Sequence, residues 1–135
     1  MGGNKNIKAL YKTLNRCTGL IEISSRDDFI RAIKANKVVI VEYFDPDNEN
    51  SKKFYLTIKD VERHVDPSIL VARINIRKTP ELSKGVHTLP CIRVFLDGEV
   101  VFEQQGVFGK RDLDLMVLRR GIRSVLRSRN VSLKI

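Results

Sequence analysis

The sequence is poor in the residues that usually carry thiol or metal chemistry. It contains two cysteines, Cys17 and Cys91, which lie far apart and form no CxxC motif, and two isolated histidines, His64 and His87. Two cysteines do not build a disulfide framework, so we expect two reduced, mostly buried thiols, although a Cys17–Cys91 bridge stays open. No histidine and cysteine cluster has the spacing of metal ligands, and we expect no metal and no cofactor.

Long apolar runs are missing as well. No stretch approaches the roughly 18 apolar residues of a membrane-spanning helix, and residues 1–6 have no apolar region like that of a signal peptide. The chain begins Met-Gly, but Asn6 stands where the myristoylation pattern has serine or threonine. With 135 residues, 42% of them hydrophobic and 30% charged, the composition predicts one globular domain, cytoplasmic and without a membrane partner.

Acidic residues are scarce at both ends of the chain. The net charge of +9 comes from residues 1–19, which contribute +4, and residues 110–135, which contribute +6, whereas residues 20–109 carry −1. Basic ends attract polyanions such as nucleic acid, or else they form a solvated surface that keeps the protein soluble. Four arginines of the C-terminal segment are the candidates for polyanion contact: Arg119, Arg120, Arg123 and Arg127.

A β-hairpin is the clearest local pattern in the chain. Every second residue from 92 to 96 is aliphatic, which is the period of a strand, and Asp97-Gly98 is a strong hairpin turn signal. Residues 99–103 are predicted to return as the partner strand. Pro90 precedes the first strand, where its missing amide donor is tolerated, and its peptide bond is a candidate for the cis form.

Periodicity and turn residues divide the rest of the chain into strands and helices. Residues 1–19 are predicted to form a basic helix that packs on the domain or docks a partner; the domain covers 20–127, and 128–135 form a basic tail, either a strand or a disordered end. Within the domain we expect strands over 20–23, 38–44 and 69–76, helices over 26–35, 51–64 and 110–127, and a short helix over 79–85.

The order of these elements resembles that of the thioredoxin family over about residues 20 to 126. The second half has the family's order of cis-proline, strand, Asp-Gly turn, strand, glycine and last helix. Residues 69–76 resemble its central strand, and 38–44 resemble the strand that enters its active-site loop. The resemblance implies an α/β thioredoxin-like fold, with a central mixed sheet of four to five strands flanked by helices and an extra N-terminal helix.

The redox motif of that family is missing. In thioredoxins a buried acid lies six residues before the first redox cysteine; with Glu42 as that acid, the CxxC positions fall on Asn48-Glu49-Asn50-Ser51. Dithiol exchange needs a thiolate at a helix N-terminus and a second thiol to resolve the mixed disulfide, and neither asparagine nor serine supplies one. Asn48 or Ser51 can cap the following helix instead, so the loop is interpreted as a turn and cap, or as a recessed recognition loop.

Arg73 stands where thioredoxins often have a lysine beside the buried acid. We therefore expect a buried Glu42–Arg73 ion pair that holds two strands in register. The alternatives are a catalytic carboxylate at Glu42, or two side chains that face solvent and do not meet. A buried pair is weak evidence for net stability, although removal of one partner is costly.

The resemblance also points to a binding face. In thioredoxin-like proteins the residue before the cis-proline, here Leu89, presents backbone groups to an extended peptide, and such pairing needs no cysteine. The alternative is that Leu89 and Pro90 only shape the loop. Cys91 is either a lone reactive thiol or a small buried strand residue. The predicted binding residues on the former active-site face are Asn48, Ser51, Leu89, Pro90 and Cys91.

Three functions are compatible with the sequence. The favoured one is a redox-inactive thioredoxin-like protein, not an enzyme, that binds another protein as an adaptor or scaffold. The second is a module associated with nucleic acid through its basic ends, similar to the CxxC-lacking thioredoxin-like component of the spliceosome, although no RNA-binding motif or aromatic platform is evident. The third is a residual thiol oxidoreductase that uses Cys91. The N-terminal and last helices are also candidates for a homodimer contact.

Overall fold

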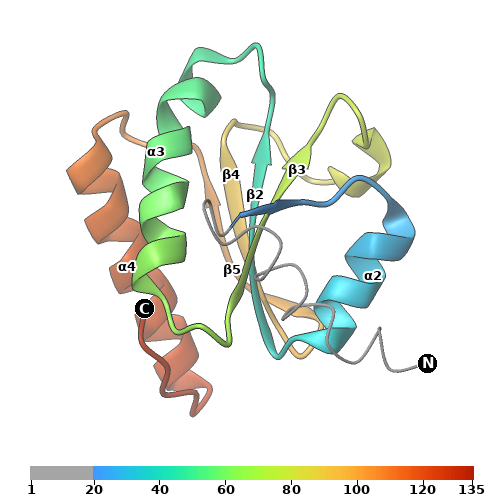
Figure 1. The fold of residues 1–135 in the computed structure, drawn as a ribbon. Helices are drawn as coiled ribbons and strands as arrows, with labels where there is room; N and C mark the ends of the chain where they lie inside the picture. Colours follow the sequence, from blue (N-terminus) through green and yellow to red (C-terminus); the bar gives the residue numbers. More distant parts are fainter. Residues whose placement is uncertain (1–19) are drawn as a thin grey trace.

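The computed structural model describes residues 20–135 (Figure 1). The predicted N-terminal helix and Cys17 lie outside the described residues. In chain order the elements are β1 (Ile21–Glu22), α2 (Arg26–Ala35), β2 (Val38–Phe44), α3 (Glu49–His64), β3 (Leu70–Asn75), the 3-10 turn η2 (Pro80–Leu82), β4 (Cys91–Leu96), β5 (Glu99–Gln105) and α4 (Arg111–Ser128).

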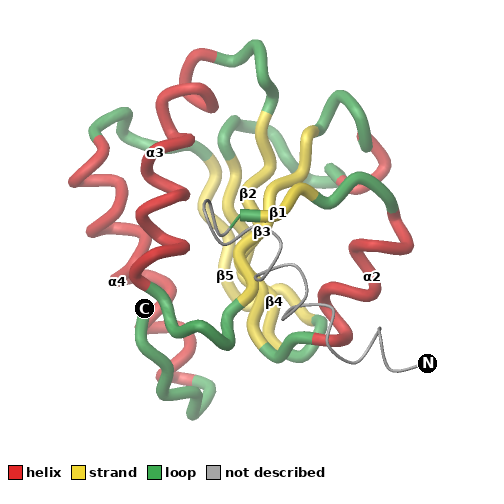
Figure 2. Tube along the Cα trace, viewed as in Figure 1, coloured by secondary structure: helices red, strands yellow, loops and turns green. Residues whose placement is uncertain are grey.

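A mixed sheet of five strands forms the centre of the described domain, in the order β1-β3-β2-β4-β5 (Figure 2). The strands β1, β3 and β2 are parallel neighbours, whereas β4 runs antiparallel to β2 and β5 antiparallel to β4. The connection from β2 through α3 to β3 is a βαβ unit, because parallel strands need a crossover. The sheet therefore has the mixed character expected from the sequence.

Helices cover both faces of this sheet. Figure 1 shows α3 and α4 on one side and α2 on the other. All seven residues of β2 are buried, as expected for a central strand covered on both faces. Alternate residues of β2 serve two separate apolar clusters: Val38 and Ile40 pack with α3 and α4, whereas Val39, Val41 and Tyr43 pack on the α2 side.

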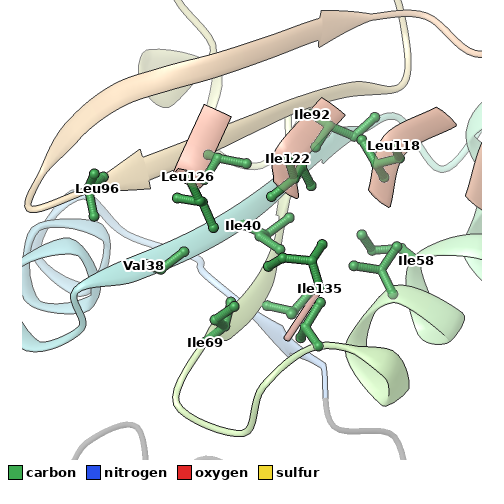
Figure 3. Packing of buried hydrophobic residues seen from close by; sticks show 14 of the residues in the cluster. Val38, Ile40, Ile58, Ile69, Ile92, Leu96, Leu118, Ile122, Leu126 and Ile135 are labelled. Carbon is green, nitrogen blue, oxygen red and sulfur yellow. The ribbon is translucent and has the colours of Figure 1, made fainter. Parts of the chain in front are cut away.

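The larger cluster joins the sheet to α3, α4 and the C-terminal segment. Figure 3 shows Ile40 of β2 among side chains of α3 and α4, including Ile58 and Ile122. The segment 129–135, for which the sequence left a strand or a disordered end open, has neither helix nor strand. Its Ile135 side chain is 2% exposed and belongs to this cluster, and the Asp66 amide donates to the Lys134 carbonyl over 2.7 Å. The end of the described chain is thus part of the core.

Polar side chains set the start of two helices. Ser25 caps α2, its hydroxyl accepting a hydrogen bond from the Asp28 amide over 3.1 Å, as the capping pattern predicts. At the other end of the domain, buried Asp114 accepts from the amides of Phe108 and Gly109 over 2.7 and 3.0 Å. This carboxylate fixes the turn before α4 and holds Phe108 at the surface.

Candidate functional site

The loop before α3 and the loop before β4 meet at one edge of the sheet. The antiparallel register of β2 and β4 sets Tyr43 opposite Cys91. Pro90 therefore lies beside Phe44, the last residue of β2, from which the chain continues into α3. The peptide bond between Leu89 and Pro90 is cis. The structure thus brings together the two segments that the sequence assigned to the former active-site face.

Asn48 and Ser51 both serve the start of α3. Asn48 is the N-cap, and its Oδ1 accepts from the Ser51 amide over 2.9 Å. The Ser51 side chain points inward: the residue is 1% exposed, and its Oγ accepts from the Asp45 amide over 3.3 Å. Both side chains therefore satisfy backbone donors that a helix start and its preceding turn leave open. This geometry agrees with the interpretation of the loop as a turn and cap.

Cys91 is a buried and unpaired thiol at the start of β4. It is the cysteine that the described residues contain, and it is fully buried. Burial raises the pKa of its thiol to about 11, against a smaller lowering by Arg93 and together with a further rise from Glu103. Because the thiolate is the reactive form, such a thiol is a poor nucleophile at neutral pH.

The Glu42–Arg73 pair lies under α3, directly across β2 and β3. Glu42 is 0% exposed, and the side chain of Arg73, its register partner, is 15% exposed. Arg73 Nε donates to Glu42 Oε1 over 2.6 Å. The alternative in which the two side chains face solvent is therefore wrong. Burial raises the pKa of the Glu42 carboxyl, while the charge and hydrogen bond of Arg73 lower it.

The Arg73 guanidinium also packs between two aromatic rings. It lies 3.8 Å from the ring centroid of Phe44 and 4.9 Å from that of Tyr55, distances at which cation–π attraction operates. A shallow hollow of about 190 Å³ opens above it, between the same rings and Ser51. Glu42 Oε2 has no hydrogen-bond partner within residues 20–135. Arg73 is therefore held by the carboxylate and by two aromatic rings, whereas one of the two carboxylate oxygens of Glu42 lacks a hydrogen bond from the described residues.

Gln105, which sequence reasoning missed, holds the loop before the cis-proline. Its Oε1 accepts from the amides of His87 and Thr88 over 2.7 and 3.0 Å, and its Nε2 donates to the Gly85 carbonyl over 2.8 Å. One side chain at the end of β5 thus satisfies three backbone groups of the loop. The predicted strand ended at 103, so no sequence signal pointed to this residue.

Arg93, on β4, also holds the loop before the cis-proline. Its Nη2 donates to the Lys84 carbonyl over 2.8 Å, and its Nε donates to Glu103 Oε1 over 2.8 Å. The guanidinium lies 4.9 Å from the ring centroid of Tyr43. Oppositely charged residues often pair across two strands, but a simple two-residue turn at Asp97-Gly98 would not set Arg93 opposite Glu103, so the sequence did not indicate this pair.

A groove of about 500 Å³ runs beside the cis-proline loop. It is lined by Thr88, residues 104–108 and Val117. Phe108 is 63% exposed, which is unusual for a large aromatic side chain. Gly106 has φ +84°, and a Cβ there would lie 3.0 Å from Thr88 Cγ2. Its amide donates to the Pro90 carbonyl over 2.8 Å, so the glycine allows the two walls of the groove to approach closely.

The candidate polyanion residues lie on α4 and line no part of this groove. Arg119 Nε and Arg123 Nη2 donate to the Ile135 carbonyl over 3.0 and 3.4 Å. Arg120 and Arg127 are exposed and form no ion pair within residues 20–135. The same described residues hold no cluster of potential metal ligands, and none of their helices combines the length and apolar character needed to span a bilayer.

Solved structures similar to this chain include several thioredoxins. The thioredoxin of Trypanosoma brucei brucei is 13% identical, with a TM-score of 0.69 over 84% of this chain and 96% of that chain. The thioredoxin of Plasmodium falciparum is 14% identical, with a TM-score of 0.65 over 74% and 97%. A thioredoxin variant from Halobacterium salinarum is 17% identical, with a TM-score of 0.64 over 76% and 89%.

No protein-family profile and no curated protein matches this sequence. At such low identities a structural likeness shows the fold and not the activity. The sheet order, the helices on both faces and these likenesses together show that the chain has the thioredoxin fold.

Proposed function

We propose that this protein is a redox-inactive thioredoxin-fold module that binds an extended segment of another protein through its cis-proline face, as an adaptor or scaffold. The observation that carries the proposal is a contrast at one edge of the sheet. The cis-proline loop is held by a dedicated side chain, Gln105, whereas the positions of the redox motif are used to cap a helix.

Backbone pairing is the means of capture. The amide and carbonyl of Leu89 have no hydrogen-bond partner within residues 20–135, although the residue is half-buried. Backbone polar groups that are open to the surface can bind water, and an extended peptide laid along the loop can replace that water by β-strand addition. The neighbouring groove and the exposed ring of Phe108 offer apolar contact for a side chain of that peptide.

Thiol chemistry is disfavoured on two grounds. Asn48 and Ser51 offer no sulfur, and the thiol pKa of Cys91 is raised to about 11. A residual oxidoreductase would need a low thiol pKa and solvent access, because both govern thiolate reactivity. Association with nucleic acid through the basic ends is the competing function and rests on charge alone. Formation of a homodimer stays a prediction.

Two measurements on the full chain test the proposal. Insulin reduction with dithiothreitol is expected to proceed no faster than without the protein, and turnover like that of a thioredoxin would refute redox inactivity. Selection of random peptides displayed on phage is expected to yield extended binders that perturb amide resonances at 86–90. Gln105→Ala should weaken these peptides at least about tenfold, since it frees three backbone groups of the loop. The control Val100→Ala, an exposed position at the turn end of the same strand and outside the groove, should not.

A further inference from the structure

We propose that the exposed side of α4 is a second docking surface, separate from the cis-proline face, and that it binds an acidic amphipathic helix of a partner protein. We call this surface the arginine face. Its residues recur at helical spacing along one side of α4, and they are Leu115, Met116, Arg119, Arg120, Arg123 and Arg127.

Charge on this surface is predominantly positive. Residues 115–135 contain six basic residues and no acidic residue. Within residues 20–135 Arg120 and Arg127 form no ion pair, whereas Arg111, at the start of the same helix, is paired with Asp60 over 2.7 Å. Asp112 is the one acidic residue among the described ones that lines the same hollow as arginines of the face. The excess of positive charge on this face fits an anionic partner, since complementary potentials steer association and select among partners.

Two apolar side chains, Leu115 and Met116, lie among these charges, and we call them the floor of the face. The hollow that they line measures about 330 Å³, and its other lining residues are Asp112, Arg119, Arg120 and Arg123. Met116 is 42% exposed in the middle of a long helix. Methionine is adaptable and is over-used on surfaces that bind more than one partner. The partner must therefore bring an apolar anchor as well as negative charge.

Two of the arginines are already held in position. Arg119 and Arg123 both donate to the Ile135 carbonyl, over 3.0 and 3.4 Å. A side chain that is fixed before binding loses less conformational entropy when it binds. Arg120 and Arg127 remain exposed beside them. The face thus combines a fixed part around the hollow with two free charges along the helix.

The shape and chemistry of the face favour a helix over nucleic acid. From Met116 to Arg127 it extends about 16 Å, or three turns of helix at about 1.5 Å per residue. Its apolar groups are aliphatic, whereas binding of single strands relies on aromatic stacking platforms. An amphipathic helix with a stripe of leucines flanked by glutamates can place its leucines on Leu115 and Met116 and its glutamates beside the arginines at the same time.

Fluorescence anisotropy with the full chain tests this proposal. The probe is a fluorescein-labelled helical peptide of about 15 residues with a leucine stripe flanked by glutamates. The comparison probes are a peptide of the same composition with scattered leucines and a single-stranded RNA of equal charge. At physiological salt we expect the amphipathic peptide to bind at least about tenfold more tightly than either comparison probe. It alone can contact the two apolar side chains and the arginines together.

Variants locate the binding. The double variant Arg120→Glu/Arg127→Glu should weaken the peptide at least about tenfold and leave Arg119 and Arg123 in place. The control Arg26→Glu/Lys34→Glu makes the same charge change on α2, across the sheet, and should alter the affinity less than about twofold. Met116→Ser should weaken the striped peptide and not the scattered one, because only the striped peptide places leucines on the floor.

The proposal is overturned if RNA binds as tightly as the striped peptide, if the two peptides bind alike, or if the striped peptide fails to bind. It is also overturned if Arg120→Glu/Arg127→Glu has no effect, or if the amide resonances that shift lie at 86–90 instead of 116–127. Gln105→Ala should leave this peptide unaffected. Failure of the arginine face is therefore distinguishable from failure of the cis-proline face.

Discussion

Replacing Arg73 by methionine tests whether the buried ion pair is organised as described. The substitution removes the guanidinium that donates to Glu42 Oε1 over 2.6 Å and leaves a carboxylate that is 0% exposed. Removal of one partner of a buried pair costs about 3–5 kcal/mol. Arg73 is itself slightly exposed, so we expect about 3 kcal/mol of lost unfolding free energy at pH 7.

The loss should depend on pH with a definite sign. Burial already raises the pKa of Glu42 above 4.5, and loss of Arg73 removes the two influences that lower it. A carboxyl whose pKa is higher in the folded state binds its proton more tightly there, so folding is favoured at low pH and weakened as pH rises above the unfolded pKa. The difference in unfolding free energy between Arg73→Met and the wild type should therefore become smaller from pH 7 to pH 5.

Urea unfolding followed by circular dichroism measures both effects, read as a shift of the midpoint at constant slope. Glu42→Gln/Arg73→Met, which removes both charges, should recover most of the stability, because an uncharged buried pair leaves no isolated charge. The control Lys52→Met breaks the exposed pair with Glu49 and should have no measurable cost. An Arg73→Met variant within about 1 kcal/mol of the wild type, or an equal loss at both pH values, would refute this account of the pair.

Three further predictions concern other parts of the domain. In a Cys17→Ser background, Cys91 should react with a thiol reagent at pH 7.5 far more slowly in the folded than in the urea-unfolded protein, because a pKa of about 11 leaves little thiolate; equal rates would contradict its burial. Gly121→Ala should lower the melting temperature despite a helix-propensity gain of about 1 kcal/mol, because the new Cβ would lie 2.8 Å from Phe102 Cε1; a higher melting temperature would show that the ring moves freely. Asn48→Ala should cost about 1 kcal/mol in urea unfolding through loss of the α3 cap, whereas Asn48→Asp should cost little, and equal losses would argue against capping.

Much of the fold could be predicted from short stretches of sequence. The buried run of β2, the Ser25 cap and the Asp97-Gly98 hairpin turn each depend on neighbours within a few residues. The Glu42–Arg73 pair was also predicted, although through resemblance to a family, because the spacing of these residues alone does not imply contact.

The bracing of the cis-proline loop could not be predicted in this way. A simple two-residue hairpin turn would set Arg93 opposite Phe102, but a bulge between Val94 and Phe95 shifts the register so that Arg93 faces Glu103. The same shift sets Gln105 opposite Cys91, at the end of β5 next to the loop. A bulge depends on how a strand packs and twists in the sheet, which nearby residues do not encode.

What the sequence by itself determined is the order of strands and helices, the central buried strand and the absence of a paired redox motif, because turn residues, caps and apolar periodicity act locally. Only the tertiary structure decided that Ile135 completes the core, that Gln105 holds the cis-proline loop, and that Met116 stays exposed among arginines. These features join residues far apart in the chain, and such contacts follow from packing and register over the whole domain, not from local preference.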